Sequence, residues 1–162
     1  MRTIFMVLVM LLGAAPVLAA TPDATAPRAA IDSFIAAFNA GDAAAAKATH
    51  EASPTIIDEP PPYLWSGRDS FDRWVADQHK EAVARGRSAE KVVLGKTRRA
   101  EMSDAVAYVI VPATYSYVEK GAALAEPSQM TFVLKKGRSG WRISAWSWTG
   151  PRGRPVASKP AA

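Results

Sequence analysis

The spacing of the apolar residues changes once along this chain, at Gly86. Before that glycine, apolar side chains recur every three or four residues, which predicts helices over about 28–40, 43–51 and 69–85. After it, four segments rich in β-branched and aromatic residues are separated by polar turns, which predicts a four-stranded antiparallel meander. Helices that precede a meander favour an α+β fold, in which three N-terminal helices pack on one face of a curved, mainly antiparallel sheet.

The first 20 residues differ in character from the rest. Arg2 precedes an apolar run that is interrupted by Pro16 and ends in small residues at Ala19 and Ala20. This pattern is typical of a cleaved signal peptide, and the run is shorter than the roughly 20 apolar residues of a membrane span. We therefore expect residues 1–20 to be removed and the mature protein to be periplasmic or secreted, with no membrane attachment after cleavage.

The rest of the chain has the composition of one domain with two loose ends. Residues 21–27 are rich in Pro, Thr and Ala, and residues 151–162 are rich in Gly and Pro, so we expect a linker and a disordered basic tail. The domain then occupies residues 28–150, a length that suits a single core. The chain has no cysteine, which excludes disulfides, thiol catalysis and thiolate metal sites.

The formal net charge of +5 does not indicate a nucleic-acid partner. Much of it comes from Arg2 and from Arg152, Arg154 and Lys159, which lie outside the predicted domain. Basic residues near 96–99 are offset by acidic neighbours, which is typical of a solvated face. Because no zinc spacing and no nucleotide-binding loop is found in the sequence, we expect neither a metal nor a cofactor.

The stretch SPTIIDEPPPYLWSG, residues 53–67, places two carboxyl groups between a β-branched pair and three prolines. Successive strand side chains point to opposite faces, so Asp58 and Glu59 should not both face the interior. If Ile56 packs inward, Asp58 does too. Asp58 then either lines a pocket or accepts backbone hydrogen bonds from the proline loop.

The chain contains three informative segments in this order: AIDSFIAAFNAGD, TIIDEPPPYLWSGRDSFDRW and MTFVLKKGRSGWRISAWSWTG. The order and spacing of these segments resemble those in the nuclear transport factor 2-like superfamily, and within it in the SnoaL-like and ketosteroid-isomerase-like domains. The resemblance covers about residues 28–150. The resemblance implies a cone-shaped, cystatin-like roll with a bent sheet wrapped around a long helix and a pocket at its wide end. It does not assign a reaction, because the superfamily includes enzymes, binding modules and domains without known activity.

The resemblance also implies a role for Asp58. In ketosteroid-isomerase-like members a carboxylate on the short first strand moves a proton next to a carbonyl, and Asp58 is similar in position. The oxyanion donor of the first helix falls at Phe34, which has no hydroxyl, and no carboxyl donor is found between Ser128 and Leu134. A base without such donors lacks a large part of the catalytic effect.

We therefore expect a domain that binds a small organic molecule in an apolar pocket rather than a ketosteroid isomerase. The alternative is an isomerase, cyclase or dehydratase that uses Asp58 as its acid/base group, with Tyr115 or His79 as an assisting polar group. His50 is placed at the end of the second helix, where the helix dipole favours a charged imidazole. Six apolar side chains are expected to form the pocket walls: Phe34, Phe38, Trp65, Trp74, Met130 and Phe132.

In the last predicted strand, GWRISAWSWTG, the large apolar side chains do not all fall on the same face. Ile143 lies on one face, while Trp146 and Trp148 lie on the other. In the favoured interpretation Trp146 and Trp148 lie on the outer face of the sheet and form a homodimer contact, as in an interaction module. In the alternative, a bulge near Ser144 and Ala145 turns both indoles inward as pocket walls. A carbohydrate-binding platform is a third interpretation.

Overall fold

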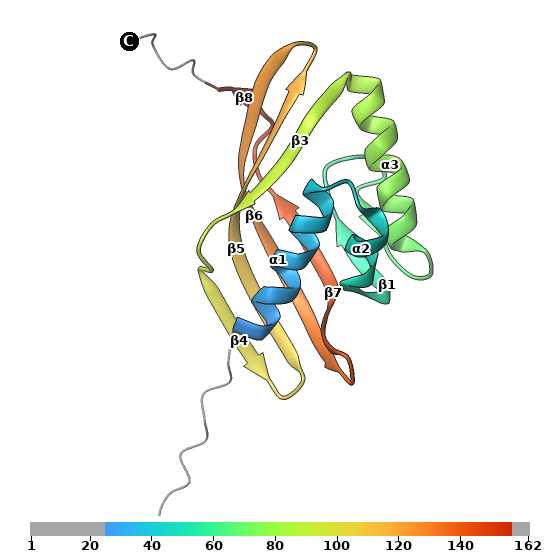
Figure 1. The fold of residues 1–162 in the computed structure, drawn as a ribbon, viewed down its shortest axis with the longest axis vertical. Helices are drawn as coiled ribbons and strands as arrows, with labels where there is room; N and C mark the ends of the chain where they lie inside the picture. Colours follow the sequence, from blue (N-terminus) through green and yellow to red (C-terminus); the bar gives the residue numbers. More distant parts are fainter. Residues whose placement is uncertain (1–24, 157–162) are drawn as a thin grey trace, which may run out of the picture.

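The computed structural model describes residues 25–156, which form three helices and one bent sheet (Figure 1). Helices α1 (Thr25–Asn39), α2 (Ala43–Ala48) and α3 (Ser70–Arg85) all lie on the same side of the sheet. This confirms the predicted α+β fold. The predicted signal peptide and the first part of the predicted linker lie outside the described residues, and within residues 25–156 no helix has the length and apolar character to span a membrane.

The sheet has eight strands, and its neighbours run antiparallel except for one parallel pair. The order along the sheet is β2-β1-β7-β6-β5-β3, with β4 on the edge of β5 and β8 on the edge of β6. The parallel pair is β1 with β7. The strands span β1 (His50–Ile57), β2 (Leu64–Trp65), β3 (Arg87–Leu94), β4 (Arg99–Ser103), β5 (Val106–Glu119), β6 (Ala122–Gly137), β7 (Gly140–Thr149) and β8 (Arg154–Pro155).

Local sequence signals set the ends of the helices. Gly41 follows α1 with a positive φ, and the Asp42 side chain then caps α2 by accepting a 2.8 Å hydrogen bond from the backbone N–H of Ala45. Gly86 ends α3 in the left-handed conformation, with φ of 66°. The end of α3 at Gly86 agrees with the sequence prediction.

The second predicted helix was too long. Helix α2 ends at Ala48, and His50 already begins β1, so Pro54 lies inside a strand instead of marking the end of a helix. Thr49 closes the helix, because its hydroxyl donates to the carbonyl of Ala46 at 2.7 Å, and its own carbonyl accepts from the N–H of Ile143 on β7 at 2.9 Å. Pairing with a distant strand thus overrides the helix propensity of the alanines.

The predicted meander is present in β5, β6 and β7, but three boundaries differ. The first predicted strand is two strands, β3 and β4, which pair with different halves of β5. Strand β6 begins at Ala122, so most of the predicted loop KGAALAEP is strand. The predicted tail also starts inside the fold, since Arg154–Pro155 pair with Leu124 and Ala125 of β6. Residues 157–162 of that tail lie outside the described residues.

The core is centred on Phe34 of α1, of which 1% is exposed. Its ring lies against His50 with a centroid distance of 4.7 Å, against Trp74 at 6.2 Å and against Trp146 at 5.7 Å. These partners come from β1, α3 and β7, so one aromatic side chain ties the long helix to three separate elements. Aromatic pairs of this kind add to the stabilisation from buried area.

A bulge in β7 decides the direction of the two tryptophans. Leu134 of β6 is opposite Ile143, but Val133 is opposite Ala145, so Ser144 is an extra residue in β7. The alternation of side chains between the two faces of the sheet therefore shifts by one residue, and both Ile143 and Trp146 are buried. The favoured prediction of an exposed tryptophan face was wrong, and the alternative of a bulge that turns Trp146 and Trp148 inward is confirmed.

His50 also differs from its prediction, because it is buried and neutral. Its ring Nδ1 lies 3.0 Å from the carbonyl oxygen of Ala46, and its Nε2 accepts a hydrogen bond from the indole N–H of Trp146 at 3.1 Å. An imidazole that donates at Nδ1 and accepts at Nε2 carries no charge. Burial lowers the pKa of His50 from 6.5 to about 4, while the bond to Ala46 opposes this effect.

This neutral histidine predicts a pH dependence of stability. Between pH 6.5 and 4 the unfolded chain binds a proton at His50 that the folded chain does not, so this group stabilises the fold above pH 6.5 and the stabilisation is lost as the pH falls towards 4. The free energy of unfolding from urea denaturation should lose about 3 kcal/mol more over this range in the wild type than in His50→Gln. Parallel slopes for the two proteins would contradict the prediction.

Candidate functional site

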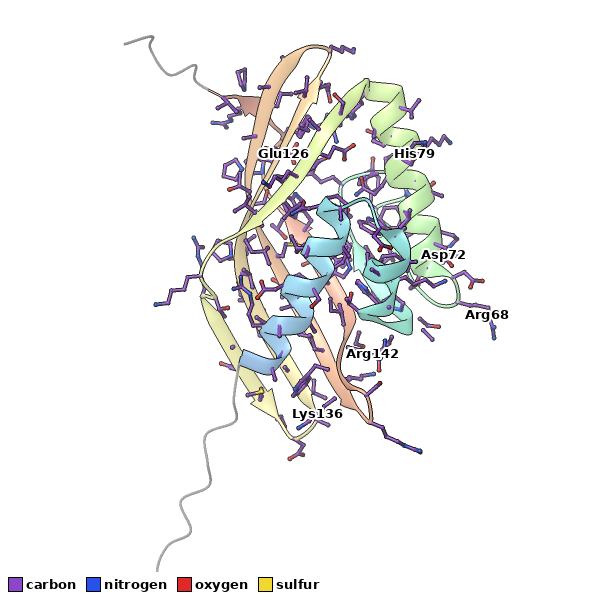
Figure 2. The ribbon with its side chains drawn as sticks, in the orientation of Figure 1. Arg68, Asp72, His79, Glu126, Lys136 and Arg142 are labelled. Carbon is purple, nitrogen blue, oxygen red and sulfur yellow. The ribbon has the colours of Figure 1, made fainter. Side chains whose placement is uncertain are left out.

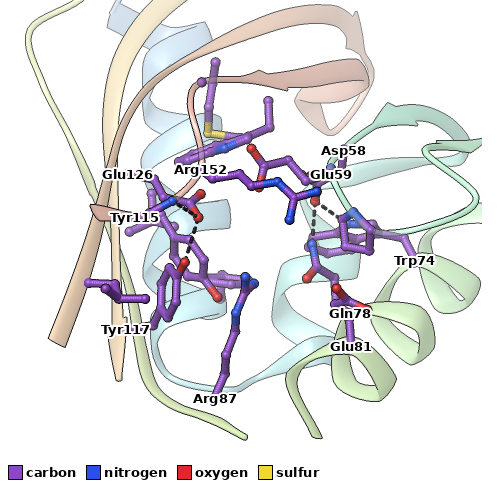
Figure 3. A pocket seen from close by; sticks show the side chains of 18 of the residues that line it. Asp58, Glu59, Trp74, Gln78, Glu81, Arg87, Tyr115, Tyr117, Glu126 and Arg152 are labelled. Atoms are coloured by element: carbon purple, nitrogen blue, oxygen red, sulfur yellow. Dashed lines mark hydrogen bonds between the residues drawn. The ribbon is translucent and has the colours of Figure 1, made fainter. Parts of the chain in front are cut away.

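A cavity of about 580 Å³ opens between the sheet, α1 and α3 (Figure 3). One side is formed by Asp58 and Glu59, which follow β1, and by Trp74 and Gln78 of α3. The opposite side is formed by residues of β5 and β6, including Tyr115, Tyr117 and Glu126. The cavity therefore has aromatic side chains and carboxyl groups on both sides.

Four of the six predicted wall residues line this cavity: Phe34, Phe38, Trp74 and Met130. The other two do not. Phe132 is 0% exposed and packs in the core two residues beyond Met130, and Trp65 is 2% exposed with its indole N–H bonded to Asp77 at 2.8 Å. Trp146 and Trp148 take their places in the wall, because the bulge at Ser144 turns them inward.

Asp58 is a fixed carboxyl group in the wall of the cavity. Its Oδ2 accepts hydrogen bonds from the indole N–H of Trp74 at 2.8 Å and from the side-chain amide of Gln78, and its Oδ1 accepts the backbone N–H of Glu59 at 2.8 Å. Both predicted alternatives for Asp58 therefore hold together, since it lines the cavity and accepts a backbone hydrogen bond. Burial raises the pKa of Asp58, and the three donors oppose this rise.

Glu59 also lines the cavity, although the sequence analysis excluded this. The strand rule of alternating faces does not reach Glu59, because β1 ends at Ile57 and the chain turns before the prolines. Burial raises the pKa of Glu59 to about 7, and the charges of Glu126 and Asp58 add to the rise. Arg87 opposes the rise with its positive charge.

Glu126 on β6 also lines the cavity, although the sequence analysis did not predict it. It is 1% exposed, and its Oε1 accepts hydrogen bonds from the Tyr117 hydroxyl and the Gly153 backbone N–H, both at 2.9 Å. Within residues 25–156 its buried Oε2 has no hydrogen-bond donor. The sequence predicts a loop up to Pro127, so Glu126 falls outside the predicted strand. Extending the two-residue alternation of Phe132 and Met130 towards the N-terminus places Glu126 on the same face, and this pattern predicts its inward direction.

Tyr115 lines the cavity but does not approach Asp58. Its hydroxyl donates a hydrogen bond to Glu90 of β3, and it lies on the opposite side of the cavity from Asp58 (Figure 3). Burial and the Glu90 carboxylate raise its pKa well above the usual range. Tyr117 lies beside it with a ring distance of 4.8 Å, and burial with the Glu126 hydrogen bond raises the pKa of Tyr117 to about 12. Both phenols are therefore neutral hydrogen-bond donors.

His79 is outside this cavity. It lies on the exposed surface of α3 and lines a separate depression beside α1 and α2 (Figure 2). The structure therefore does not bring His79 together with Asp58 or Tyr115. Across the described ranges there is also no group of three or more His, Cys, Asp or Glu side chains arranged to hold a metal ion.

The C-terminal segment 150–156, here called the strap, crosses the end of the cavity. Gly150, Arg152 and Gly153 line it, and the strap is held by the Gly153 contact to Glu126 and by a 3.1 Å bond from the N–H of Val156 to the carbonyl of Ala123. A Cβ on Gly153 would lie 2.3 Å from the Tyr117 hydroxyl oxygen. A residue without a side chain is therefore required at this contact.

We expect Gly153→Ala to detach the strap. Its methyl group overlaps the Tyr117 hydroxyl, and overpacking of this kind costs about 1–3 kcal/mol, which is comparable with the net contribution of the few hydrogen bonds that hold the strap. Hydrogen exchange should show loss of protection at the Val156 amide. Gly137→Ala is the matched control, because a Cβ there comes no closer than 4.0 Å to a neighbour. Unchanged protection in Gly153→Ala would contradict the role of this contact.

Known proteins share this fold at low sequence identity. A ketosteroid isomerase-like protein from Erwinia carotovora atroseptica superposes with a TM-score of 0.62 at 17% identity, covering 81% of this chain and 98% of that one. A nuclear transport factor 2-like superfamily protein from Salmonella enterica serovar Typhimurium superposes with a TM-score of 0.63 at 16% identity, covering 81% and 92%.

An NTF2-like protein with a cystatin-like fold from Novosphingobium aromaticivorans has a TM-score of 0.62 at 16% identity, covering 78% of this chain and 80% of that one. These likenesses agree with the predicted cystatin-like roll. No functionally curated protein matches this chain. The profile of the SnoaL-like domain matches residues 28–148, so this chain belongs to the SnoaL-like domain family.

Proposed function

We propose that this protein binds a small, largely apolar organic molecule in the cavity between the sheet, α1 and α3. The observation that carries the proposal is the composition of the cavity, in which aromatic walls surround a few fixed polar groups. The volume of about 580 Å³ lies within the range of about 300–1,000 Å³ that is usual for ligand pockets. The bulge at Ser144 supports this, because it places two tryptophans in the wall.

A neutral apolar dye tests this binding. N-phenyl-1-naphthylamine should bind one to one with increased fluorescence, and Trp148→Ala should weaken its binding about tenfold, because a large aromatic contact is lost. The control is Val83→Ala on α3, where the side chain is 67% exposed. Equal affinity in Trp148→Ala and Val83→Ala would place the dye elsewhere, and no binding at all would reject the function.

A second candidate is acid–base catalysis, which the geometry of Asp58 favours. Three N–H donors fix its carboxyl group beside the cavity, and burial raises its pKa, so it combines a defined position with increased basicity. We infer that Asp58 can remove a proton next to a carbonyl of a bound ligand.

Exchange of the α-protons of 2-tetralone in D₂O, followed by NMR, tests this reaction. We expect the wild type to accelerate the exchange and Asp58→Asn to lower the rate by about 100-fold or more, with dye binding retained. The rate should rise with pH over a range above about 4, because the base must be ionised and burial raises its pKa. Asp72→Asn, an exposed change on α3, is the control. An active Asp58→Asn variant would exclude this candidate.

Export and a homodimer remain part of the proposal. Export rests on the signal-like residues 1–20, and N-terminal sequencing of the exported protein would test it. The predicted dimer contact through Trp146 and Trp148 is not present on the surface, because Trp146 is 4% exposed and Trp148 faces the cavity. Without that surface, the homodimer stays a prediction.

A further inference from the structure

The charged side chains around the cavity do not balance one another. At the rim, Arg85 forms an ion pair with Glu81, and Arg87 forms one with Glu119 at 2.8 Å. These four groups neutralise each other in pairs. They therefore leave three carboxyl groups and one arginine of the cavity lining outside these ion pairs.

Those remaining groups are Asp58, Glu59 and Glu126, and they face one arginine, Arg152. Arg152 is an exposed side chain of the strap, and across residues 25–156 no carboxylate lies within ion-pair distance of it. The three carboxyl groups repel one another, and this repulsion contributes to the raised pKa of Asp58 and Glu59. Such a cluster is stabilised by any positive charge that enters it.

Glu126 marks the point where such a charge fits. Its Oε2 is buried without a hydrogen-bond donor from residues 25–156, and a buried acceptor left in this state destabilises the fold. Glu59, in the loop that follows β1, lines the same cavity, and a protonated Glu59 carboxyl group has one donor at most. A ligand with several N–H donors would supply more than one, and to both carboxylates at once.

The aromatic walls next to Glu126 also suit a cation. The rings of Tyr115 and Trp148 are nearly perpendicular, with their centroids 6.1 Å apart, and Tyr117 lies 4.8 Å from Tyr115. The guanidinium of Arg87 already lies 4.3 Å from the centre of the Tyr117 ring. Ring faces of this kind attract ammonium groups, and more strongly where water is excluded.

We propose that the ligand of this cavity is a protonated amine carried on an apolar ring system, with its ammonium group between Glu59 and Glu126. This inference rests on the proposed binding function and names the chemical class of the ligand. The ammonium donates hydrogen bonds to both carboxylates. The ring system lies against Trp146, Trp148 and Phe38.

The pH dependence of binding follows from the groups around this subsite. Glu59 and Glu126 are faced by Asp58 after β1, by Arg87 of β3, by Tyr115, Tyr117 and Glu119 of β5, and by Arg152 of the strap. The pKa of Glu59 is about 7, so the carboxyl group is ionised above this pH and binds the amine, and it is protonated and neutral below it. Amine affinity should therefore fall as the pH decreases from 8 to 5.

Three isosteric compounds test the charge preference by calorimetry: 2-(2-naphthyl)ethylamine, 2-(2-naphthyl)ethanol and 2-naphthylacetic acid. At pH 8 the amine should bind at least about tenfold more tightly than the alcohol, because hydrogen bonds to charged groups contribute about 1.5–3 kcal/mol, and the acid should bind most weakly. At pH 5 the advantage of the amine over the alcohol should be smaller, because Glu59 is then protonated. The amine itself stays protonated over this range, as a lysine side chain does.

Two variants locate the effect. Glu126→Gln should remove most of the advantage of the amine while the alcohol still binds. Glu59→Gln should have the same effect. Because Glu59 lies outside the core, this second variant tests the subsite even if Glu126→Gln fails to fold. Glu101→Gln on β4, an exposed change of the same kind, should leave all affinities unchanged.

The outcomes separate the two proposals. Equal affinity of the amine and the alcohol at pH 8, or an amine advantage that survives in Glu59→Gln and Glu126→Gln, overturns the cationic ligand and leaves the proposed binding function standing. Binding of none of the three compounds overturns both.

Discussion

The extra residue at Ser144 is the constraint on which both the core and the cavity depend. Ile143 faces inward before it and Trp146 faces inward after it, which a regular strand does not allow. Trp146 then completes the core, because it packs against Trp74 at 5.1 Å and donates a hydrogen bond to His50. Two residues later the same phase places Trp148 in the cavity wall. One local irregularity therefore links the packing of the sheet to the shape of the site.

The parts of the fold that could be predicted are those that short-range sequence patterns specify. The apolar spacing of Phe34 and its neighbours, the cap at Asp42 and the stop at Gly86 act over a few residues, and the structure agrees with them. The start of β1 at His50 could not be predicted in this way. It depends on a parallel pair with β7, whose residues are more than 90 positions away in the chain, and such pairing overrides local propensity.

The candidate site was predicted in part for the same reason. Asp58 was found because it ends a strand and precedes prolines, which are local features. Glu59 was excluded by a rule that holds inside strands, and Glu126 was missed because β6 is longer than the pattern around Pro127 suggested. The partners of these groups, such as Gly153 and Gln78, come from distant segments, so sequence spacing could not bring them together.

The carboxyl groups are better explained by function than by stability. Three of them share one cavity, and burial raises the pKa of both Asp58 and Glu59, which means that the folded state opposes their ionisation. Apolar residues of similar size would pack there without this cost, and perturbed pKa values of this kind gather at functional sites. The strap strengthens the argument. It lies beyond residue 148, where the family match ends, yet the N–H of Gly153 orients Glu126. The polar end of the cavity therefore depends on a segment outside the matched domain, and ligand preference has to be measured on this chain rather than transferred from proteins that share its fold.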